Sequence, residues 1–290
     1  MKTTTWLKKN TCSLEKRTVA ISGSTGGIGR ELCSYIAALG ASLVLIDRNR
    51  KKSEALKDEL VCRYPDLSVT LLTADMSDPH SVDKAIEELK ELPIDVLICN
   101  AGAYSIPRYK CENGYDNVFQ INFVSPYTIV RRLLPNLRER NGKVVVVGSI
   151  AHNYSRSDPN DVDFSTRKKS SLVYGNSKRY LMFTLSELFK NELEVGFAIT
   201  HPGITFTGIT SHYPKLLFAI IKHPMKIIFP HPRRACLSVL LGVFENTQGS
   251  EWIGPRFFNI WGIPKKKKLR TVKSEELEYF AKWNEDKTNA

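Results

Sequence analysis

The 290-residue sequence lacks the features that mark several large classes of protein. No apolar run reaches the ~18 residues that a membrane-spanning helix needs, so we expect no transmembrane segment. The first 17 residues contain no continuous apolar core, and we expect no signal peptide there. No internal repeat or domain linker is found, and 42% hydrophobic with 25% charged residues excludes a disordered or fibrous chain.

The cysteines are too scattered to form a metal site or a disulfide framework. They lie at positions 12, 33, 62, 99, 111 and 236, with no Cys-x-x-Cys pair and no metal-ligand spacing. Scattered single cysteines in an α/β pattern indicate reduced thiols. The sequence therefore predicts a cytoplasmic protein with no metal.

Acidic residues are outnumbered, since 30 Asp and Glu stand against 42 Lys and Arg and leave a net charge of +12. Such an excess attracts anions, including phosphorylated cofactors, acidic lipids and nucleic acids. The alternative is a solvated basic surface, which is also our interpretation of the four lysines at 265–268. No aromatic platform or nucleic-acid motif is present, so we expect no nucleic-acid partner.

Short apolar runs alternate with amphipathic ones along the chain. We expect strands at 18–22, 42–46, 68–73, 94–99, 143–147 and 197–200, a last helix at 231–244 and a last strand at 256–260. Near-continuous apolar strands separated by helices predict an α/β fold, with a doubly wound, Rossmann-type parallel sheet of about seven strands and helices on both faces. This domain is expected at 16–263, between an N-terminal arm at 1–15 and a basic tail at 264–290 with a short helix at 274–284.

A glycine-rich segment, SGSTGGIG at 22–29, follows the first expected strand. Its glycines let the backbone approach a pyrophosphate, and the helix that begins there offers N–H groups to the phosphates. A structural turn is the alternative. Asp47 ends the second strand, where its carboxylate would bond the adenosine ribose and repel a 2′-phosphate, although capping of the next helix would also explain it. Arg48 would pair with that phosphate, and the balance favours NAD over NADP.

Tyr174 and Lys178 lie four residues apart in an expected helix, so their side chains share one face. An ammonium group beside a phenol favours the ionised phenol, which ordinarily titrates near ~10. The alternative is an aromatic ring packed on a lysine stem.

Taken in order, these motifs resemble the short, non-extended branch of the short-chain dehydrogenase/reductase family over residues 16–262. Glycines 23, 27 and 29 match its G-x-x-x-G-x-G loop, and the long insert between Ser149 and Tyr174 resembles its retinol dehydrogenase-like members. Ser22, Cys99 and Gly148 depart from the family pattern without removing a proton-transfer group. The further matches are Asp75-Met76, Asn100-Ala101-Gly102, Asn122, Ser149, and Pro202-Gly203 with Thr205 and Thr207.

The resemblance implies an NAD(P)-dependent oxidoreductase that interconverts an alcohol and a ketone or aldehyde. Tyr174 would be the general acid or base, Ser149 would orient the substrate oxygen, and Lys178 would depress the phenol pKa and hold the nicotinamide ribose. Asn122 would anchor a water, or else distort its helix by bonding to backbone. The implied catalytic residues are Asn122, Ser149, Tyr174 and Lys178. The implied cofactor contacts are Gly23, Ser24, Thr25, Gly27, Ile28, Gly29, Asp47, Arg48, Asp75, Met76, Asn100, Ala101, Gly102, Tyr174, Lys178, Pro202, Gly203, Thr205 and Thr207.

Substrate contacts are expected mainly from residues 103–113, 150–172 and 204–230. The apolar and basic segment 214–230 predicts a pocket lid or a peripheral membrane contact, with packing against the domain as the alternative, and it suggests a lipophilic substrate. His201 is expected to be structural. The family default is a homodimer or homotetramer. The rival function is an NAD(P)-binding redox sensor or scaffold without turnover.

Overall fold

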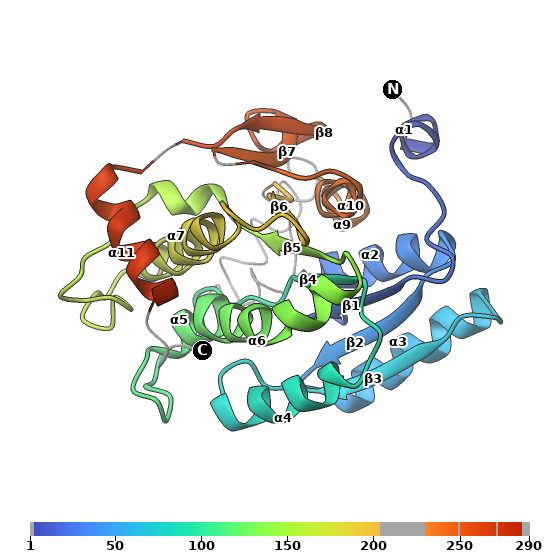
Figure 1. Ribbon diagram of the computed structural model, residues 1–290, viewed down its shortest axis with the longest axis horizontal. Helices are drawn as coiled ribbons and strands as arrows, with labels where there is room; N and C mark the ends of the chain where they lie inside the picture. Colours follow the sequence, from blue (N-terminus) through green and yellow to red (C-terminus); the bar gives the residue numbers. More distant parts are fainter. Residues whose placement is uncertain (1–2, 204–229, 249, 271, 286–290) are drawn as a thin grey trace, which may run out of the picture.

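The computed structural model of the protein describes residues 3–203, 230–248, 250–270 and 272–285 (Figure 1). Thr205, Thr207 and nearly all of segment 214–230 therefore lie outside the described residues. The elements are α1 (Thr3–Asn10), β1 (Thr18–Ser22), α2 (Gly27–Ala38), β2 (Ser42–Asp47), α3 (Arg50–Arg63), β3 (Val69–Thr73), α4 (Pro79–Lys90), β4 (Val96–Cys99), α5 (Asn117–Phe119), the π-helical turn η1 (Gln120–Val124), α6 (Ser125–Glu139), β5 (Lys143–Val147), the 3₁₀ turn η2 (Ile150–Asn153), α7 (Ser170–Leu188), β6 (Gly196–Thr200), α9 (Pro232–Ala235), α10 (Leu237–Phe244), β7 (Glu251–Phe257), β8 (Trp261–Lys268) and α11 (Ser274–Glu285).

The strands form one eight-stranded sheet in the order β3-β2-β1-β4-β5-β6-β7-β8. Strands β1 to β7 are parallel, whereas β8 returns antiparallel to β7 as a hairpin. The predicted doubly wound α/β fold is confirmed. The last strand predicted at 256–260 is placed too late in the sequence: β7 spans Glu251–Phe257, with Trp252 and Ile253 buried, and residues 258–260 form the turn that follows it.

Helices cover both faces of the sheet, as Figure 1 shows, because successive strand side chains point to opposite faces. In β1, Val19 and Ile21 belong to the core cluster that α1, α2, α3 and α10 complete. Ala20 belongs to the other cluster, which packs against α4, α6, α7 and α11. In the described residues, no helix is long and apolar enough to cross a membrane.

In the described residues, helices and strands cover more of the expected N-terminal arm and C-terminal tail than the sequence predicted. The expected N-terminal arm contains α1, whose Trp6 side chain is buried in the core. The expected domain end at 263 falls inside β8, and the lysines at 265–268 complete that strand, where Lys265, Lys266 and Lys268 are exposed to solvent as predicted. They pair with β7, so the backbone hydrogen bonds of the hairpin place the lysines at the sheet edge.

Helix α11 confirms the short helix predicted at 274–284 and packs against α7. Phe280 is fully buried and its ring contacts Tyr180 and Phe183 of α7. Arg179 of α7 donates to both carboxylate oxygens of Glu276, at 2.9 and 2.6 Å, and both side chains are buried. The C-terminal helix is therefore anchored to α7, the helix that carries Tyr174 and Lys178.

We expect Phe280→Ala to lower the free energy of unfolding by about 3–5 kcal/mol, because it leaves a cavity between α11 and α7. Urea denaturation monitored by circular dichroism measures this. The exposed Glu278→Ala on the same helix is the control and should change stability by less than about 0.5 kcal/mol. An equal effect of the two substitutions would show that α11 does not dock through Phe280.

Candidate active site

The candidate active site is assembled from the turns that follow the parallel strands. Because these strands run in one direction, their carboxyl ends reach the same edge of the sheet. The predicted site residues found at that edge are the loop 22–29 after β1, Asp47 at the end of β2, Asp75 after β3, Asn100 after β4, Ser149 after β5 and Pro202 after β6.

The glycine loop is packed too closely to accept side chains at two positions. Gly23 has a φ of +67°, and a Cβ there would lie 2.8 Å from the Cα of Ala101. A Cβ on Gly29 would lie 2.2 Å from the carbonyl oxygen of Gly23. The Asn100 side chain donates to the carbonyls of Ser22 and Gly23 at 3.0 and 2.9 Å. The turn after β4 thus fixes the loop that follows β1.

The start of α2 fits a phosphate group. Its N-cap is Gly26, which is extended and supplies no side chain to the N–H groups of the first turn. Helix α2 then begins at Gly27, while Ile28 packs against the core. Backbone N–H groups and the positive end of the helix dipole together favour an anion at this position.

Two departures from the family pattern leave the loop intact. The hydroxyl of Ser22 accepts hydrogen bonds from the backbone N–H groups of Asn100 and Ala101, both at 3.1 Å. Cys99 is buried, and burial raises the pKa of its thiol to about 12. Cys99 is therefore a neutral packing group beside the loop.

Asp47 is bonded to the glycine loop. Its carboxylate accepts from the backbone N–H of Thr25 at 3.1 Å, from the Thr25 hydroxyl at 2.9 Å and from the Ser24 hydroxyl. Ser53 of α3 donates a further bond at 3.2 Å, and Asp47 is only 5% exposed. Sequence reasoning assigned this carboxylate to a ribose, but in the structure it joins β2 to the loop after β1. Arg48, the next residue, is exposed.

The turn after β3 places the predicted Asp75 and Met76. The Asp75 carboxylate accepts from the backbone N–H and the hydroxyl of Ser77, at 2.9 and 2.7 Å. Met76 is buried, and its carbonyl accepts from the Ser125 hydroxyl at 2.7 Å. These bonds define the turn, while an adenine contact by Asp75 stays a prediction.

Ser149 and Tyr174 are brought together across 25 residues of sequence, as predicted. The Ser149 hydroxyl accepts from the backbone N–H of Ala151 at 3.2 Å and so caps η2. Burial raises the pKa of the Tyr174 phenol to about 12, and a hydrogen bond with Ser149 opposes that rise. The phenol is therefore protonated at neutral pH and held against the serine hydroxyl.

Lys178 lies on the same side of α7 as Tyr174, with its ammonium nitrogen 6.0 Å from the centre of the tyrosine ring. Its ammonium group is buried and donates to the carbonyl of Val147 at 2.9 Å. Burial lowers the pKa of Lys178 to about 8. The expectation that Lys178 depresses the phenol pKa is not met in this structure, because burial shifts both groups toward their neutral forms.

Asn122 occupies a π-helical turn, η1, between α5 and α6. Pro126 has no N–H to donate to the carbonyl of Asn122 four residues earlier, so the α-helical ladder breaks here. The Asn122 side chain accepts from the N–H of Ala103 at 2.9 Å and donates to its carbonyl at 2.8 Å. It also donates to the Ser177 hydroxyl at 3.2 Å. The alternative weighed from sequence, a side chain bonded to backbone at a helix distortion, is what the structure contains.

The turn after β6 contains His201, Pro202 and Gly203. Gly203 has a φ of +86°, and a Cβ there would lie 3.1 Å from the carbonyl of Ile260. His201 stacks on Trp252 with ring centres 5.0 Å apart, and burial lowers the pKa of its imidazole to about 3. His201 is thus a neutral structural residue, as predicted.

Comparison with known proteins identifies the family. The family model described as short chain dehydrogenase matches residues 17–159. A dehydrogenase/reductase SDR family member from Arabidopsis thaliana, FEY, is 29% identical over 83% of this chain and 68% of its own length. Mouse retinol dehydrogenase 12 is 29% identical over 67% of this chain and 63% of its own length.

The chain belongs to the short-chain dehydrogenase/reductase family. It spans about two thirds of the length of these curated relatives. A solved short-chain dehydrogenase from Sphingobium yanoikuyae in complex with NADPH shares the fold, with a TM-score of 0.60 at 22% identity over 78% of this chain and 84% of that one. The protein is accordingly an oxidoreductase of the NAD(P)-using kind.

Two tyrosines beside the predicted catalytic residue Tyr174 of this short-chain dehydrogenase/reductase were not found from sequence. The ring of Tyr104 meets that of Tyr174 edge to face at 5.2 Å. Tyr154 packs over Gly175, since a Cβ on that glycine would lie 3.3 Å from the Cβ of Tyr154. Both tyrosines lie in the segments expected to contact substrate, but no motif distinguishes them from other aromatic residues there.

Arg179, the neighbour of Lys178, was also missed. Besides its ion pair with Glu276, it donates to the carbonyl of His152 in η2 at 2.9 Å. Glu276 in turn accepts from the backbone N–H of Ser157 at 2.8 Å. The segment that follows Ser149 is thereby tied to α7 and α11, a link across about a hundred residues that no local pattern could indicate.

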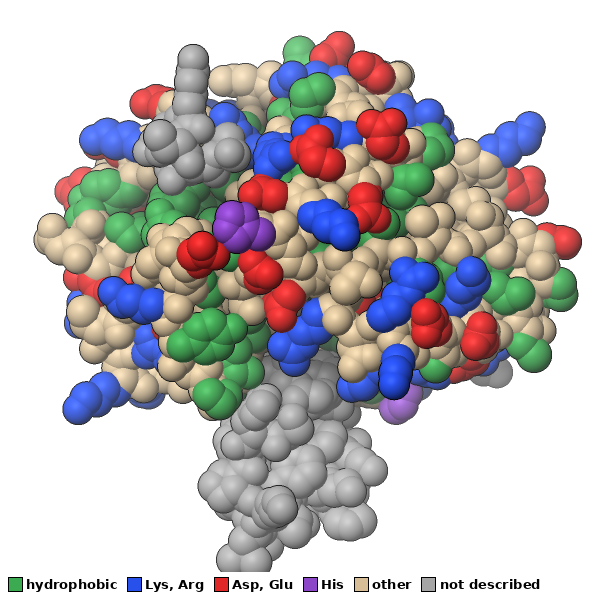
Figure 2. Space-filling model, turned by 90° about the horizontal axis from the view of Figure 1, so that it is seen from below, with side chains coloured by type: hydrophobic (Ala, Val, Ile, Leu, Met, Phe, Trp, Pro, Cys, Tyr) green, Lys and Arg blue, Asp and Glu red, His purple; other side chains and the backbone are tan. Residues whose placement is uncertain are grey.

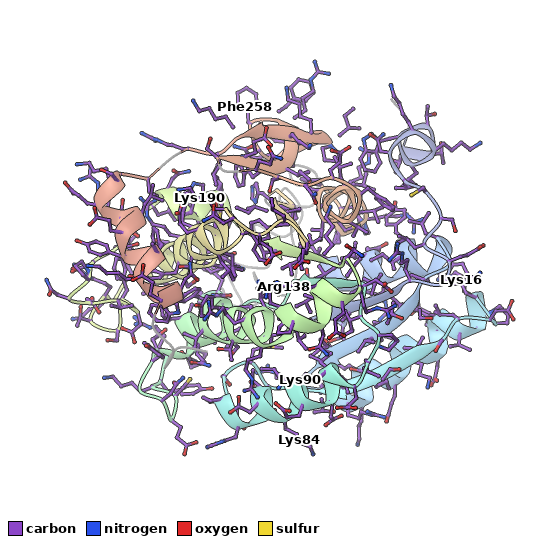
Figure 3. All side chains as sticks on the ribbon, in the orientation of Figure 1. Lys16, Lys84, Lys90, Arg138, Lys190 and Phe258 are labelled. Carbon is purple, nitrogen blue, oxygen red and sulfur yellow. The ribbon has the colours of Figure 1, made fainter. Side chains whose placement is uncertain are left out.

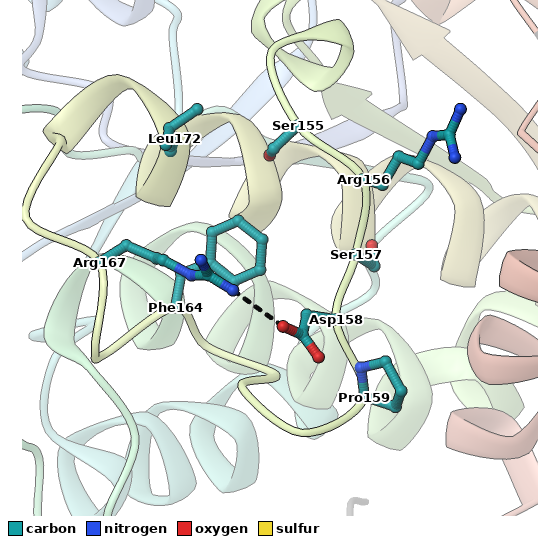
Figure 4. A pocket seen from close by; sticks show the side chains of 8 residues that line it. All are labelled: Ser155, Arg156, Ser157, Asp158, Pro159, Phe164, Arg167 and Leu172. Atoms are coloured by element: carbon teal, nitrogen blue, oxygen red, sulfur yellow. Dashed lines mark hydrogen bonds and ion pairs between the residues drawn. The ribbon is translucent and has the colours of Figure 1, made fainter.

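The insert between Ser149 and Tyr174 encloses a cavity of about 330 Å³ (Figure 4). An ion pair between Arg167 and Asp158, at 2.8 Å, crosses it. The buried hydroxyls of Ser155 and Ser157 make no hydrogen bond with the described residues. Neither Ser149 nor Tyr174 lines it; the lining residues are Ser155, Arg156, Ser157, Asp158, Pro159, Phe164, Arg167 and Leu172.

Because burial lowers the pKa of Lys178, we expect the free energy of unfolding to depend on pH. Between about 8 and its ordinary pKa of 10.5, the unfolded chain binds a proton that the folded protein does not, so stability rises with pH across that window. We expect Lys178→Met to stabilise the protein most near neutral pH. This gain in the free energy of unfolding should shrink by about 3 kcal/mol as the pH approaches the ordinary lysine pKa of 10.5.

Urea denaturation of both proteins over this pH range measures the difference. The two proteins must be compared directly, because the pKa of Lys143 is also lowered to about 8 by burial and contributes to both curves. The exposed Lys84→Met is the control. A stability difference between wild type and Lys178→Met that is constant with pH would contradict the prediction.

Proposed function

We propose that this short-chain dehydrogenase/reductase interconverts a lipophilic alcohol and the corresponding ketone or aldehyde. The observation that carries the proposal is that Ser149, after β5, and Tyr174 of α7 come together, with the buried Lys178 ammonium on the same side of α7. Two hydroxyl groups held this close together can both form a hydrogen bond with one substrate oxygen. A purely structural arrangement does not need a buried lysine at this position.

The residues of the carboxyl edge fit a dinucleotide cofactor, since Gly23 and Gly29 leave no room for side chains and the first turn of α2 lacks a side-chain cap. NAD(P)H, when bound, supplies the hydride. In reduction, Tyr174 donates the proton of its phenol to the substrate oxygen while Ser149 donates a hydrogen bond to the same atom. Lys178 then stabilises the phenolate by its charge until solvent restores the proton, and oxidation reverses these steps.

A lipophilic substrate is supported by the side chains around Tyr174. Tyr104 meets its ring, and Tyr154, which lies near it, is 53% exposed. The insert contributes Phe164 and Leu172, which pack with Val118 of α5. Aromatic rings beside the Tyr174 phenol suit a substrate that is apolar apart from its reacting oxygen. Mouse retinol dehydrogenase 12 is among the similar proteins.

Tyr174→Phe is expected to lower kcat by roughly a hundredfold or more, because the general acid is removed, while cofactor binding is unchanged. Absorbance of the reduced nicotinamide, followed with a panel of apolar ketones and aldehydes, measures turnover. Tyr104→Phe keeps the neighbouring ring and is the control, with kcat expected within a few fold of wild type. Equal loss in both variants would remove the special role of Tyr174, and cofactor binding without turnover in the wild type would favour the redox-sensor alternative.

The cofactor preference proposed from the geometry is NADP, which reverses the balance drawn from sequence. The carboxylate of Asp47 already accepts four hydrogen bonds from the protein, whereas the guanidinium group of Arg48 is exposed and able to pair with a 2′-phosphate. The similar Sphingobium enzyme was solved with NADPH. A preference for NAD, which the sequence favoured, is the alternative to this proposal.

We expect Arg48→Ala to weaken NADPH binding by roughly tenfold or more and to leave NADH binding nearly unchanged, because only NADPH carries the extra phosphate. Fluorescence titration with the two reduced cofactors in parallel measures both affinities. The exposed Lys84→Ala on α4 is a control for the general loss of one positive charge. A wild-type protein that binds NADH more tightly, with Arg48→Ala without effect, would restore the NAD assignment.

A further inference from the structure

The turn between β7 and β8 exposes aromatic side chains. Phe258 is 80% exposed, Phe257 54% and Trp261 41%. Figure 3 shows Phe258 at the outer end of the β7–β8 hairpin, directed away from the body of the molecule. Other large exposed side chains, such as Leu193, occur singly, whereas these three lie within five residues. A cluster of this kind marks a contact surface.

The turn holds its aromatic residue in a strained backbone conformation. Phe258 and Asn259 have φ angles of +50° and +57°, and the N–H of Ile260 donates to the carbonyl of Phe257 at 3.0 Å. Two successive left-handed residues suit Asn and Gly, but a bulky aromatic residue rarely adopts this conformation. Strain at an exposed aromatic residue indicates that its presentation serves a function.

The tip is braced from within the hairpin. Lys267 donates to the carbonyl of Pro255 at 3.0 Å and to the side chain of Asn259 at 2.5 Å. The ring of Phe258 lies edge to face with that of Trp261, with centres 6.5 Å apart. The aromatic tip is therefore preformed, and a partner would not have to order it first.

Positive charge follows the tip along β8, from Lys265 to Lys268, which lies opposite Glu251 at the base of the hairpin. Residues 252–273 contain seven Lys and Arg and no Asp or Glu. Lys265, Lys266 and Lys268 of β8 are exposed, and of these only Lys266 has an ion pair among the described residues, with Glu245 at 2.9 Å. Figure 2 shows a different character on the face at the bottom of Figure 1, where acidic side chains lie among the basic ones. The hairpin thus carries exposed aromatic side chains and an excess of positive charge.

The hairpin tip also lies at the edge of the sheet that carries the candidate active site. Strand β7 runs parallel to β6, so Phe257 ends β7 at the same edge at which His201 follows β6. A Cβ on Gly203 would lie 3.1 Å from the carbonyl of Ile260 and 3.4 Å from that of Asn259. The turn of the hairpin therefore contacts Gly203, one of the predicted cofactor contacts.

We propose that the β7–β8 hairpin tip docks the protein onto an anionic membrane surface, with Phe257, Phe258 and Trp261 at the level of the lipid headgroups. Aromatic rings prefer this interfacial depth, and the lysines of β8 are attracted to acidic headgroups. We commit to a membrane because an aromatic tip followed by a basic strand is the combination that interfacial membrane contacts use. This site differs from segment 214–230 and does not depend on the proposed reaction.

Co-sedimentation of the full chain with vesicles tests the proposal. Vesicles of phosphatidylcholine alone are compared with vesicles that also contain phosphatidylserine, at low and high salt. We expect binding to the phosphatidylserine vesicles that weakens with salt, and little binding to phosphatidylcholine. Absence of binding to both kinds of vesicle at low salt would overturn the proposal.

Phe258→Asn separates membrane docking from folding. Asparagine tolerates the left-handed conformation at this position, so the melting temperature should stay the same or rise. The partition coefficient onto phosphatidylserine vesicles should fall roughly fivefold to tenfold, because an aromatic ring is lost from the interface. Unchanged membrane binding of Phe258→Asn would contradict docking through the tip.

The charge contribution is tested by the double variant Lys265→Gln with Lys268→Gln, which should lower the partition coefficient by roughly tenfold or more. The matched control is Lys51→Gln with Lys84→Gln, which removes the same charge from exposed positions of α3 and α4; Figure 3 shows Lys84 on the side of the molecule away from Phe258. A fall of the same size in the control, or loss through the lysines without any loss through Phe258→Asn, would indicate a purely electrostatic anion partner and overturn the proposal.

Discussion

The buried ammonium group of Lys178 is the constraint around which the site is organised. It donates to the carbonyl of Val147 at the carboxyl end of β5, and in the described part of the chain no carboxylate lies within ion-pair distance. A desolvated cation is costly unless its surroundings hold it in place. The support comes from helix α7, the sheet edge and the turn that contains Asn122. The ammonium charge lies on the same side of α7 as Tyr174, where it would stabilise a phenolate anion.

The same constraint explains why α7 is fastened from outside. Arg179, one residue after Lys178, is bonded to Glu276 of α11 and to the carbonyl of His152 in η2. Because η2 begins directly after Ser149, these bonds fix the serine and the lysine relative to each other. The C-terminal helix is thus part of the structure that positions Ser149 and Lys178, the proposed catalytic groups, although it lies far from them in sequence.

Sequence patterns predicted the features whose causes are local. Strand positions, the glycine loop and the spacing of Tyr174 and Lys178 follow from periodicity, sterics and helix geometry. The bonds of Asp47 to Ser53 and Thr25, and of Arg179 to Glu276, depend on tertiary contacts that no local pattern contains. Strand β8 was missed because a run of lysines is typical of a solvated tail, whereas here it pairs with β7 at the sheet edge. The raised phenol pKa follows from burial, which sequence does not reveal.

The most direct test of this account is the ultraviolet titration of the Tyr174 phenol, taken as the difference between wild type and Tyr174→Phe. In the protein alone, the difference should show a phenol with a pKa of about 12. With oxidised NADP added, the positive charge that the nicotinamide would bring to the site should move this titration by at least one unit toward neutral pH. A Tyr174 titration that is the same with and without the oxidised cofactor would contradict the central claim that Tyr174 is the proton-transfer group.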